Sequence, residues 1–145
     1  MDTGAPLPMP GTTRAAITVH WLQALLFAAA TVSFALSLQS RISHGQPLLD
    51  GPTFFTWFGL VFCATFAALT TAAAIRLHRR GGRTFALVLQ WILATLYGLA
   101  FVMALIVLIA QHDYIAPAIT AILLALPVAA LILLSRRETS RWFET

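Results

Sequence analysis

The sequence predicts an all-α integral membrane protein with four transmembrane helices in an up-down-up-down bundle. Of its 145 residues, 59% are hydrophobic and 10% are charged, whereas about 25% of a typical soluble domain is charged. Four stretches contain no Asp, Glu, Lys or Arg and are long enough to cross a hydrocarbon core, which takes about 20 residues. None alternates as the strands of a membrane barrel do. We expect helices at about residues 15–40, 54–76, 84–111 and 115–135, which together form one domain over residues 15–135.

The segment before the first helix, residues 1–14, contains Pro6, Pro8 and Pro10 and has no apolar period. We therefore expect a mobile tail. A cleaved signal peptide is the alternative account of the first helix, because Arg14 precedes it and small residues follow in "SFALS". A signal core has about 7 to 15 apolar residues, and this segment is longer, which favours a retained helix.

Prolines mark the second and fourth helices. Pro52 and Pro117 suit the first turn of a helix, where the missing N–H is not needed. Pro127 lies in the middle of the fourth helix, removes one backbone hydrogen bond and predicts a bend. Cys63, the only cysteine of the chain, lies within the second helix, where we expect it to fill space as a small apolar side chain.

Small residues recur every four positions in the first three helices. Such a spacing lets helix backbones approach closely, either inside one bundle or between subunits. The pattern therefore leaves a homo-oligomer or a hetero-oligomer open. The residues concerned are Ala24 and Ala28, then Ala64, Ala68 and Ala72, and finally Ala94 and Gly98.

The arginines predict the orientation. If the helices alternate, both termini and the loop between the second and third helices share one side, which carries eight of the nine basic residues, while the other side carries Arg41 alone. Because short basic loops resist translocation, both termini should be cytoplasmic in a bacterial inner membrane. This arrangement makes the lipid bilayer, and not nucleic acid, the partner of the positive charge. The eight residues are Arg14, Arg76, Arg79, Arg80, Arg83, Arg136, Arg137 and Arg141.

The last segment, residues 136–145, is a basic and aromatic cytoplasmic tail. We expect it to lie on the inner leaflet, with its arginines toward anionic headgroups and with Trp142 and Phe143 as interfacial anchors.

No arrangement of residues typical of catalysis or metal binding is present. The four windows contain no Asp, Glu, Lys or Arg at depth, where proton-coupled carriers and ion pumps bind the coupling ion, which disfavours a pore or carrier. A pair of carboxylates is also missing, and no serine or cysteine has a histidine at a useful spacing. We therefore assign no catalytic residue and no metal ligand, which favours a non-enzymatic protein without deciding the question.

Four neutral polar side chains are predicted to share one depth in the membrane. His20, Gln90, Thr70 and Thr71 each lie five to seven residues from a cytoplasmic arginine, or roughly 8 to 10 Å inward at 1.5 Å per residue. Polar groups at such a depth turn away from lipid and form interhelical hydrogen bonds of about 0.6 to 2 kcal/mol each. We predict an interhelical polar cluster of these four residues.

The stretch from Arg14 to Leu26, "R-x-x-x-x-x-HW-L-x-A-L-L", resembles the first helix of bacterial cytochrome b561-type membrane proteins. The resemblance implies a four-helix inner-membrane protein that binds haem b between paired histidines and exchanges electrons with quinones or superoxide, with His20 as an axial ligand. It covers one helix of four. The third helix has Gln90 and Leu93 where further ligands would be sought, so His78 or a partner chain would have to supply the second imidazole.

Three functions follow from these observations. The first is a small polytopic membrane protein that acts through helix packing, as an accessory subunit or as an interaction or immunity-type protein. The second is a degenerate b561-like redox subunit with haem b. The third is a small pore or carrier.

Overall fold

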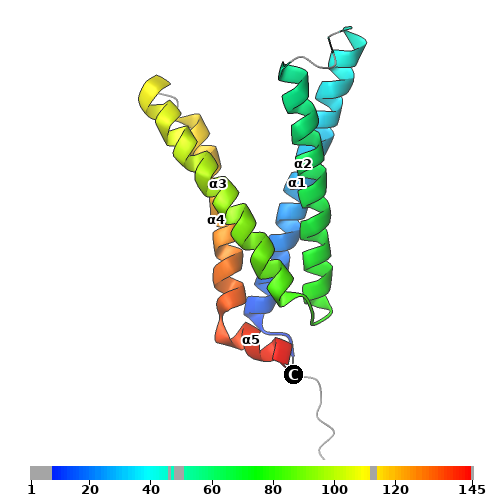
Figure 1. The fold of residues 1–145 in the computed structure, drawn as a ribbon. Coiled ribbons are helices and arrows are strands. Elements are labelled where there is room, and N and C mark those ends of the chain that lie inside the picture. Colours follow the sequence, from blue (N-terminus) through cyan, green and yellow to red (C-terminus); the bar gives the residue numbers. More distant parts are fainter. Residues whose placement is uncertain (1–7, 46, 48–50, 112–113, 145) are drawn as a thin grey trace, which may run out of the picture. The chain divides into compact units, whose positions relative to one another are not determined.

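A computed structural model of the chain describes residues 8–45, 47, 51–111 and 114–144. This part of the chain contains five helices and no strand (Figure 1). The predicted all-α class is therefore confirmed. The helices are α1 (Gly11–Ser43), α2 (Gly51–His78), α3 (Arg83–Gln111), α4 (Ile115–Ser135) and α5 (Arg137–Glu144).

Helices α1 to α4 are each long and apolar enough to cross a membrane. Large apolar side chains such as Leu25, Phe55, Leu99 and Ile122 are exposed on their surfaces. Water would disfavour such surfaces, whereas a hydrocarbon solvent matches them, because it places no penalty on exposed apolar side chains. The chain is thus a multi-pass membrane protein.

Hydroxyl groups on these helices donate back to their own backbone. Each of four threonines donates a hydrogen bond of 2.7 to 2.9 Å to the carbonyl four residues earlier. This satisfies a hydroxyl without a partner helix, so threonine is tolerated at membrane depth. The four are Thr31, Thr65, Thr95 and Thr120.

The helix boundaries differ most from the prediction at α1 and α2. Helix α1 begins at Gly11, because the Pro10 carbonyl accepts hydrogen bonds of 3.1 Å from the N–H groups of Thr13 and Arg14. The end of the expected mobile tail is therefore helical, while residues 1–7 lie outside the described residues. A charge-free window marks the part of a helix that spans hydrocarbon, and the helix continues into the charged flanks.

The chain divides into two compact units. Unit 1 contains the residues up to His20 together with those from Ala73 onward, and unit 2 contains Trp21–Ala72.

In unit 2, α1 and α2 contact each other through aromatic rings. The ring of Phe27 stacks on that of Phe66 at a centroid distance of 5.6 Å. Gly59 faces Phe34 so closely that an added Cβ would lie 2.6 Å from the ring. Cys63 is buried in the same unit, in keeping with a small apolar role.

In unit 1, α3 packs along α4, and α5 follows at the end of α4. Helix α4 continues without interruption through Pro127, which is buried. Small side chains at the core let the backbones approach closely. The fully buried apolar residues of this core are Ala16, Ala73, Ala74, Leu77, Ala86, Leu93, Ala130 and Leu134.

Candidate functional site

The most buried polar contact of the chain's described part joins α1 and α3 in unit 1. His20 and Gln90 are both 0% exposed. His20 Nδ1 lies 2.8 Å from the Ala16 carbonyl oxygen, and its Nε2 lies 3.0 Å from Gln90 Nε2. One neutral tautomer satisfies both contacts, because Nδ1–H donates to Ala16 while Nε2 accepts from the Gln90 amide. Both nitrogens of the imidazole are thus used within the chain.

This pair is well suited to hold two helices together. A hydrogen bond between membrane helices contributes about 0.6 to 2 kcal/mol, and the alternative of an unpaired amide in an apolar core is costly. The carbonyl of Ala16 fixes the ring on α1, and the ring in turn positions its bond to α3. The His20–Gln90 pair therefore joins the part of α1 that belongs to unit 1 to α3.

The two threonines of the predicted cluster lie in unit 2 and bond within α2. Thr70 donates to the carbonyls of Phe66 and Ala67 at 2.7 and 3.2 Å, and Thr71 donates to that of Ala67 at 2.7 Å. The structure therefore brings together His20 and Gln90, whereas the hydroxyl hydrogens of Thr70 and Thr71 are used one turn back in their own helix. A hydropathy pattern predicts the depth of these threonines, but it does not reveal that each hydroxyl bonds to a carbonyl of its own helix.

The arrangement around His20 does not fit a haem ligand. A neutral imidazole has one lone pair for iron, and here that lone pair accepts the Gln90 amide hydrogen. His78 is exposed and lines a cleft with Arg14, His44 is exposed in unit 2, and His112 lies outside the described residues. Within the described chain, no group of three or more His, Cys, Asp or Glu side chains is placed to hold a metal ion.

A second polar feature lies at the basic end of unit 1, where α3 begins and α4 ends. The Arg83 guanidinium donates through Nε and a terminal nitrogen to the Leu134 carbonyl at 3.2 and 3.1 Å. Its other terminal nitrogen donates to Ser140 Oγ at 2.9 Å. The last carbonyls of a helix have no intrahelical partner. Arg83 thus caps α4 and connects it to α5.

Helix α5 is held by further contacts from other parts of unit 1. Thr12 and Thr139 share a hydrogen bond of 2.9 Å between their hydroxyl groups. The Arg80 guanidinium carbon lies 5.0 Å from the centre of the Trp142 ring, a cation–π distance. Trp142 is only 4% exposed. The expected interfacial anchor is therefore a core residue, because α5 folds back against the ends of the longer helices.

The turn between α2 and α3 positions these arginines. Gly81 N–H donates to the Arg76 carbonyl at 2.9 Å and Arg80 N–H to that of Leu77 at 3.2 Å, which is the Schellman pattern of a helix C-terminus. Arg80 occupies the left-handed position at φ 57°, where glycine is usual. Gly82 is also left-handed, and a Cβ there would lie 2.8 Å from the Arg76 side chain.

Sequence reasoning missed Arg83 as a helix cap and α5 as a packed element. One signal was available, since Thr139, Trp142 and Phe143 follow the i, i+3, i+4 spacing of a helix face. The spacing indicates an amphipathic helix but not the surface that it covers. The Arg83 contact joins residues 51 positions apart in the sequence, which no local pattern reveals.

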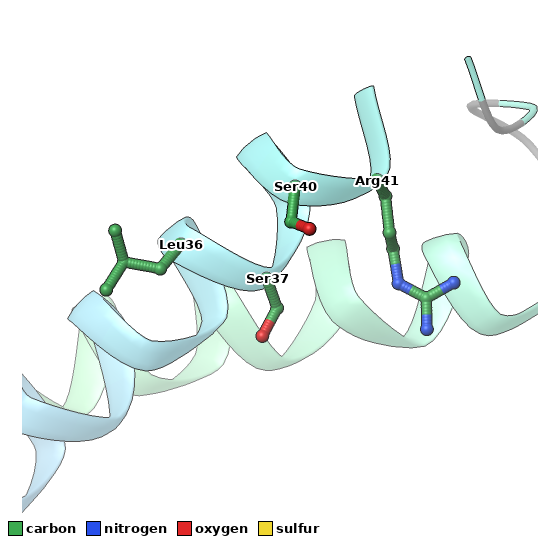
Figure 2. A pocket seen from close by; sticks show the side chains of 4 residues that line it. All are labelled: Leu36, Ser37, Ser40 and Arg41. Carbon is green, nitrogen blue, oxygen red and sulfur yellow. The ribbon is translucent and has the colours of Figure 1, made fainter. Parts of the chain in front are cut away.

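A polar cleft of about 520 Å³ lies on unit 2 near the end of α1. Figure 2 shows Ser37 and Ser40 between Leu36 and Arg41. A serine nucleophile needs a general base, and none of these four lining side chains is one. These four side chains therefore form no arrangement for covalent catalysis.

Comparisons with known proteins assign the chain to no family. No protein-family model matches the chain, and neither a curated protein nor a solved structure matches it.

Proposed function

We propose that this chain is a multi-pass protein of a bacterial inner membrane that acts through helix packing, as an accessory subunit or as an interaction or immunity-type protein. The observation that carries the proposal is the closed His20–Gln90 pair. His20 Nε2 joins α1 to α3 through the Gln90 amide, and His20 Nδ1 bonds to the Ala16 carbonyl, so both imidazole nitrogens have partners within the chain. A site built for a ligand would instead present a polar group toward the ligand.

The surface of the four long helices supports the same role. Their charge-free spans contain no Asp, Glu, Lys or Arg for ion coupling, and the buried imidazole of His20 is bonded to Ala16 and Gln90. Exposed apolar side chains, including Leu99 and Ile122, offer area for contact with another membrane helix. Membrane helices associate through such close packing, since lipid gives little hydrophobic driving force.

A photo-crosslinking amino acid placed at Leu99 or Ile122 in native membranes tests this role. We expect a discrete protein adduct from at least one helix face, with a matched position at buried Leu93 as the control for internal positions. Adducts with lipid alone at every exposed position would contradict a packing function.

We also propose that both termini are cytoplasmic. The support is the distribution of arginines, eight against one. A cytoplasm-active reporter should work when fused at the C-terminus, and a periplasm-active reporter should work in the loop that contains Gly45. The reverse pattern would overturn the orientation.

The degenerate b561-like redox subunit remains the alternative, on the resemblance of the stretch from Arg14 to Leu26. It requires the Gln90 amide to release His20 Nε2, so that iron takes its place. The two functions therefore differ in what occupies a single lone pair, and an absorption spectrum distinguishes them.

A further inference from the structure

A shallow cleft of about 370 Å³ lies between α3 and the end of α4 in unit 1. Trp91 contributes from α3, and α4 contributes a stripe that ends at the junction with α5. The full set of lining residues is Trp91, Val128, Leu131, Ile132, Ser135 and Arg136.

The polarity of this cleft is ordered along the helix. Val128, Leu131 and Ile132 line it from within the apolar span of α4, and Ser135 and Arg136 line it where that span ends. Arg136 follows Val128 by eight residues, which corresponds to about 12 Å along a helix axis. Ser135 ends the apolar span of α4 and Arg136 follows it, so a hydroxyl and a guanidinium lie at the polar end of the span, while the apolar stripe lies within it. This is the order of groups in a phospholipid.

The Arg136 side chain is available for an anion, in contrast to Arg83 and Arg80. Arg83 is bonded to Leu134 and Ser140, and the Arg80 guanidinium lies over the Trp142 ring. Arg136 is exposed at the extended residue between α4 and α5, with φ −62° and ψ 140°. Its guanidinium makes no ion pair with any carboxylate that the structure describes. A guanidinium pairs with phosphate through two parallel N–H groups.

We propose that this cleft is a binding site for one anionic phospholipid, with the phosphate on Arg136 and Ser135 and an acyl chain along Val128 and Ile132 beside Trp91. Charge complementarity selects an anionic lipid, and the apolar stripe selects an acyl chain over a soluble phosphate. The inner leaflet, which carries anionic lipids, attracts basic residues by about 1 kcal/mol each.

Native mass spectrometry of the full chain in detergent micelles tests the site. Phosphatidylglycerol and phosphatidylcholine with identical acyl chains are titrated, and the bound lipid is counted. We expect the wild type to prefer phosphatidylglycerol by about fivefold, the ratio that corresponds to about 1 kcal/mol. Arg136→Gln should bring this ratio close to one. Arg137→Gln removes the same charge from the next residue, outside the cleft, and should keep the preference.

A second pair of variants tests the acyl chain. Val128→Trp fills the cleft without changing charge and should weaken the binding of both lipids severalfold. Ile122→Trp, on an exposed part of α4 outside the cleft, should leave binding unchanged. Circular dichroism checks that both variants keep the wild-type helix content, and Ile132→Trp replaces Val128→Trp if that variant does not fold.

Four results would overturn the proposal. An equal loss of the preference for phosphatidylglycerol in Arg136→Gln and Arg137→Gln would show that diffuse surface charge, and not a site, attracts the lipid. Full displacement of the lipid by millimolar inorganic phosphate would indicate a site for a free anion. Unchanged lipid binding in a folded cleft-filling variant, or a second copy of the chain bound in place of lipid, would exclude an acyl chain from the cleft.

Discussion

Replacing Arg83 by methionine should release α5 from the end of α4. The guanidinium serves two acceptors, the Leu134 carbonyl and Ser140 Oγ. A hydrogen bond to a charged group contributes about 1.5 to 3 kcal/mol, so two acceptors give about 3 to 6 kcal/mol before screening. Arg83 is half-buried, and solvent screening reduces the net effect to about 2 kcal/mol. Methionine keeps an unbranched apolar chain in place of the arginine methylene groups. The loss of stability therefore reports the hydrogen bonds of the guanidinium and not the packing of the side chain.

Hydrogen–deuterium exchange of the α5 backbone amides measures this loss directly. About 2 kcal/mol corresponds to an opening that is about 30-fold more frequent. Arg79→Met is the matched control, because Arg79 is exposed in the same turn and carries the same charge. Arg83→Lys should lose about half as much free energy of α5 protection, since an ammonium is a point charge and lacks the planar set of N–H donors of a guanidinium. Equal α5 exchange in Arg83→Met and Arg79→Met would refute the role of Arg83 as a cap.

Two further predictions concern the helix interiors, and both are measured as free energies of unfolding in mixed detergent micelles. Gly59→Ala should destabilise the chain by about 1 to 3 kcal/mol, because the new methyl overlaps the Phe34 ring. Gly98→Ala is the control, because a Cβ at that position meets nothing within 4 Å. Equal losses of unfolding free energy in the two variants would contradict this explanation. Pro127→Ala should stay within about 1 kcal/mol of the wild type, because the regained bond to Leu123 offsets the lost ring contacts. Loss of function in a fully folded Pro127→Ala protein would instead identify a hinge.

The membrane architecture follows from the sequence because its cause is local. A charge-free run of sufficient length has few alternatives to a helix in lipid, where each backbone group needs an internal partner. The ranges 84–111 and 115–135 were therefore predicted to within one residue of α3 and α4. Helix α1 was predicted too short, because its first turn is stabilised outside the apolar window by Pro10 and by the Thr12–Thr139 bond.

Only part of the candidate site could be predicted from the sequence. Depth from the nearest arginine placed His20 and Gln90 at one level, and a polar group at that level requires a partner. The same argument applied to Thr70 and Thr71, but a threonine hydroxyl reaches the carbonyl one turn back and needs no second helix. Imidazole and amide groups have both a donor and an acceptor, so a bond to the own backbone leaves a second group for a neighbouring helix.

The C-terminal segment shows a different limit. Its composition predicts an amphipathic, basic surface, and both lipid and protein satisfy such a face equally well. Arg80 favours packing of α5 against protein, because its side chain lies over the Trp142 ring. Its backbone is left-handed, which is unusual for a residue other than glycine. That conformation arises from the α2–α3 turn, far from α5 in the sequence, and so no pattern within residues 136–145 reveals it.

The proposed function requires that His20 joins α1 to α3 in place of binding haem. The visible absorption spectrum of the chain, purified from haem-replete cells as wild type, His20→Gln and His20→Leu, tests it most directly when unfolding is measured on the same samples. We expect no Soret band in any sample, a free energy of unfolding that is retained in His20→Gln, and a loss of about 1 kcal/mol in His20→Leu, where the Gln90 amide loses its acceptor. A Soret band in the wild type that disappears equally in both variants would contradict it.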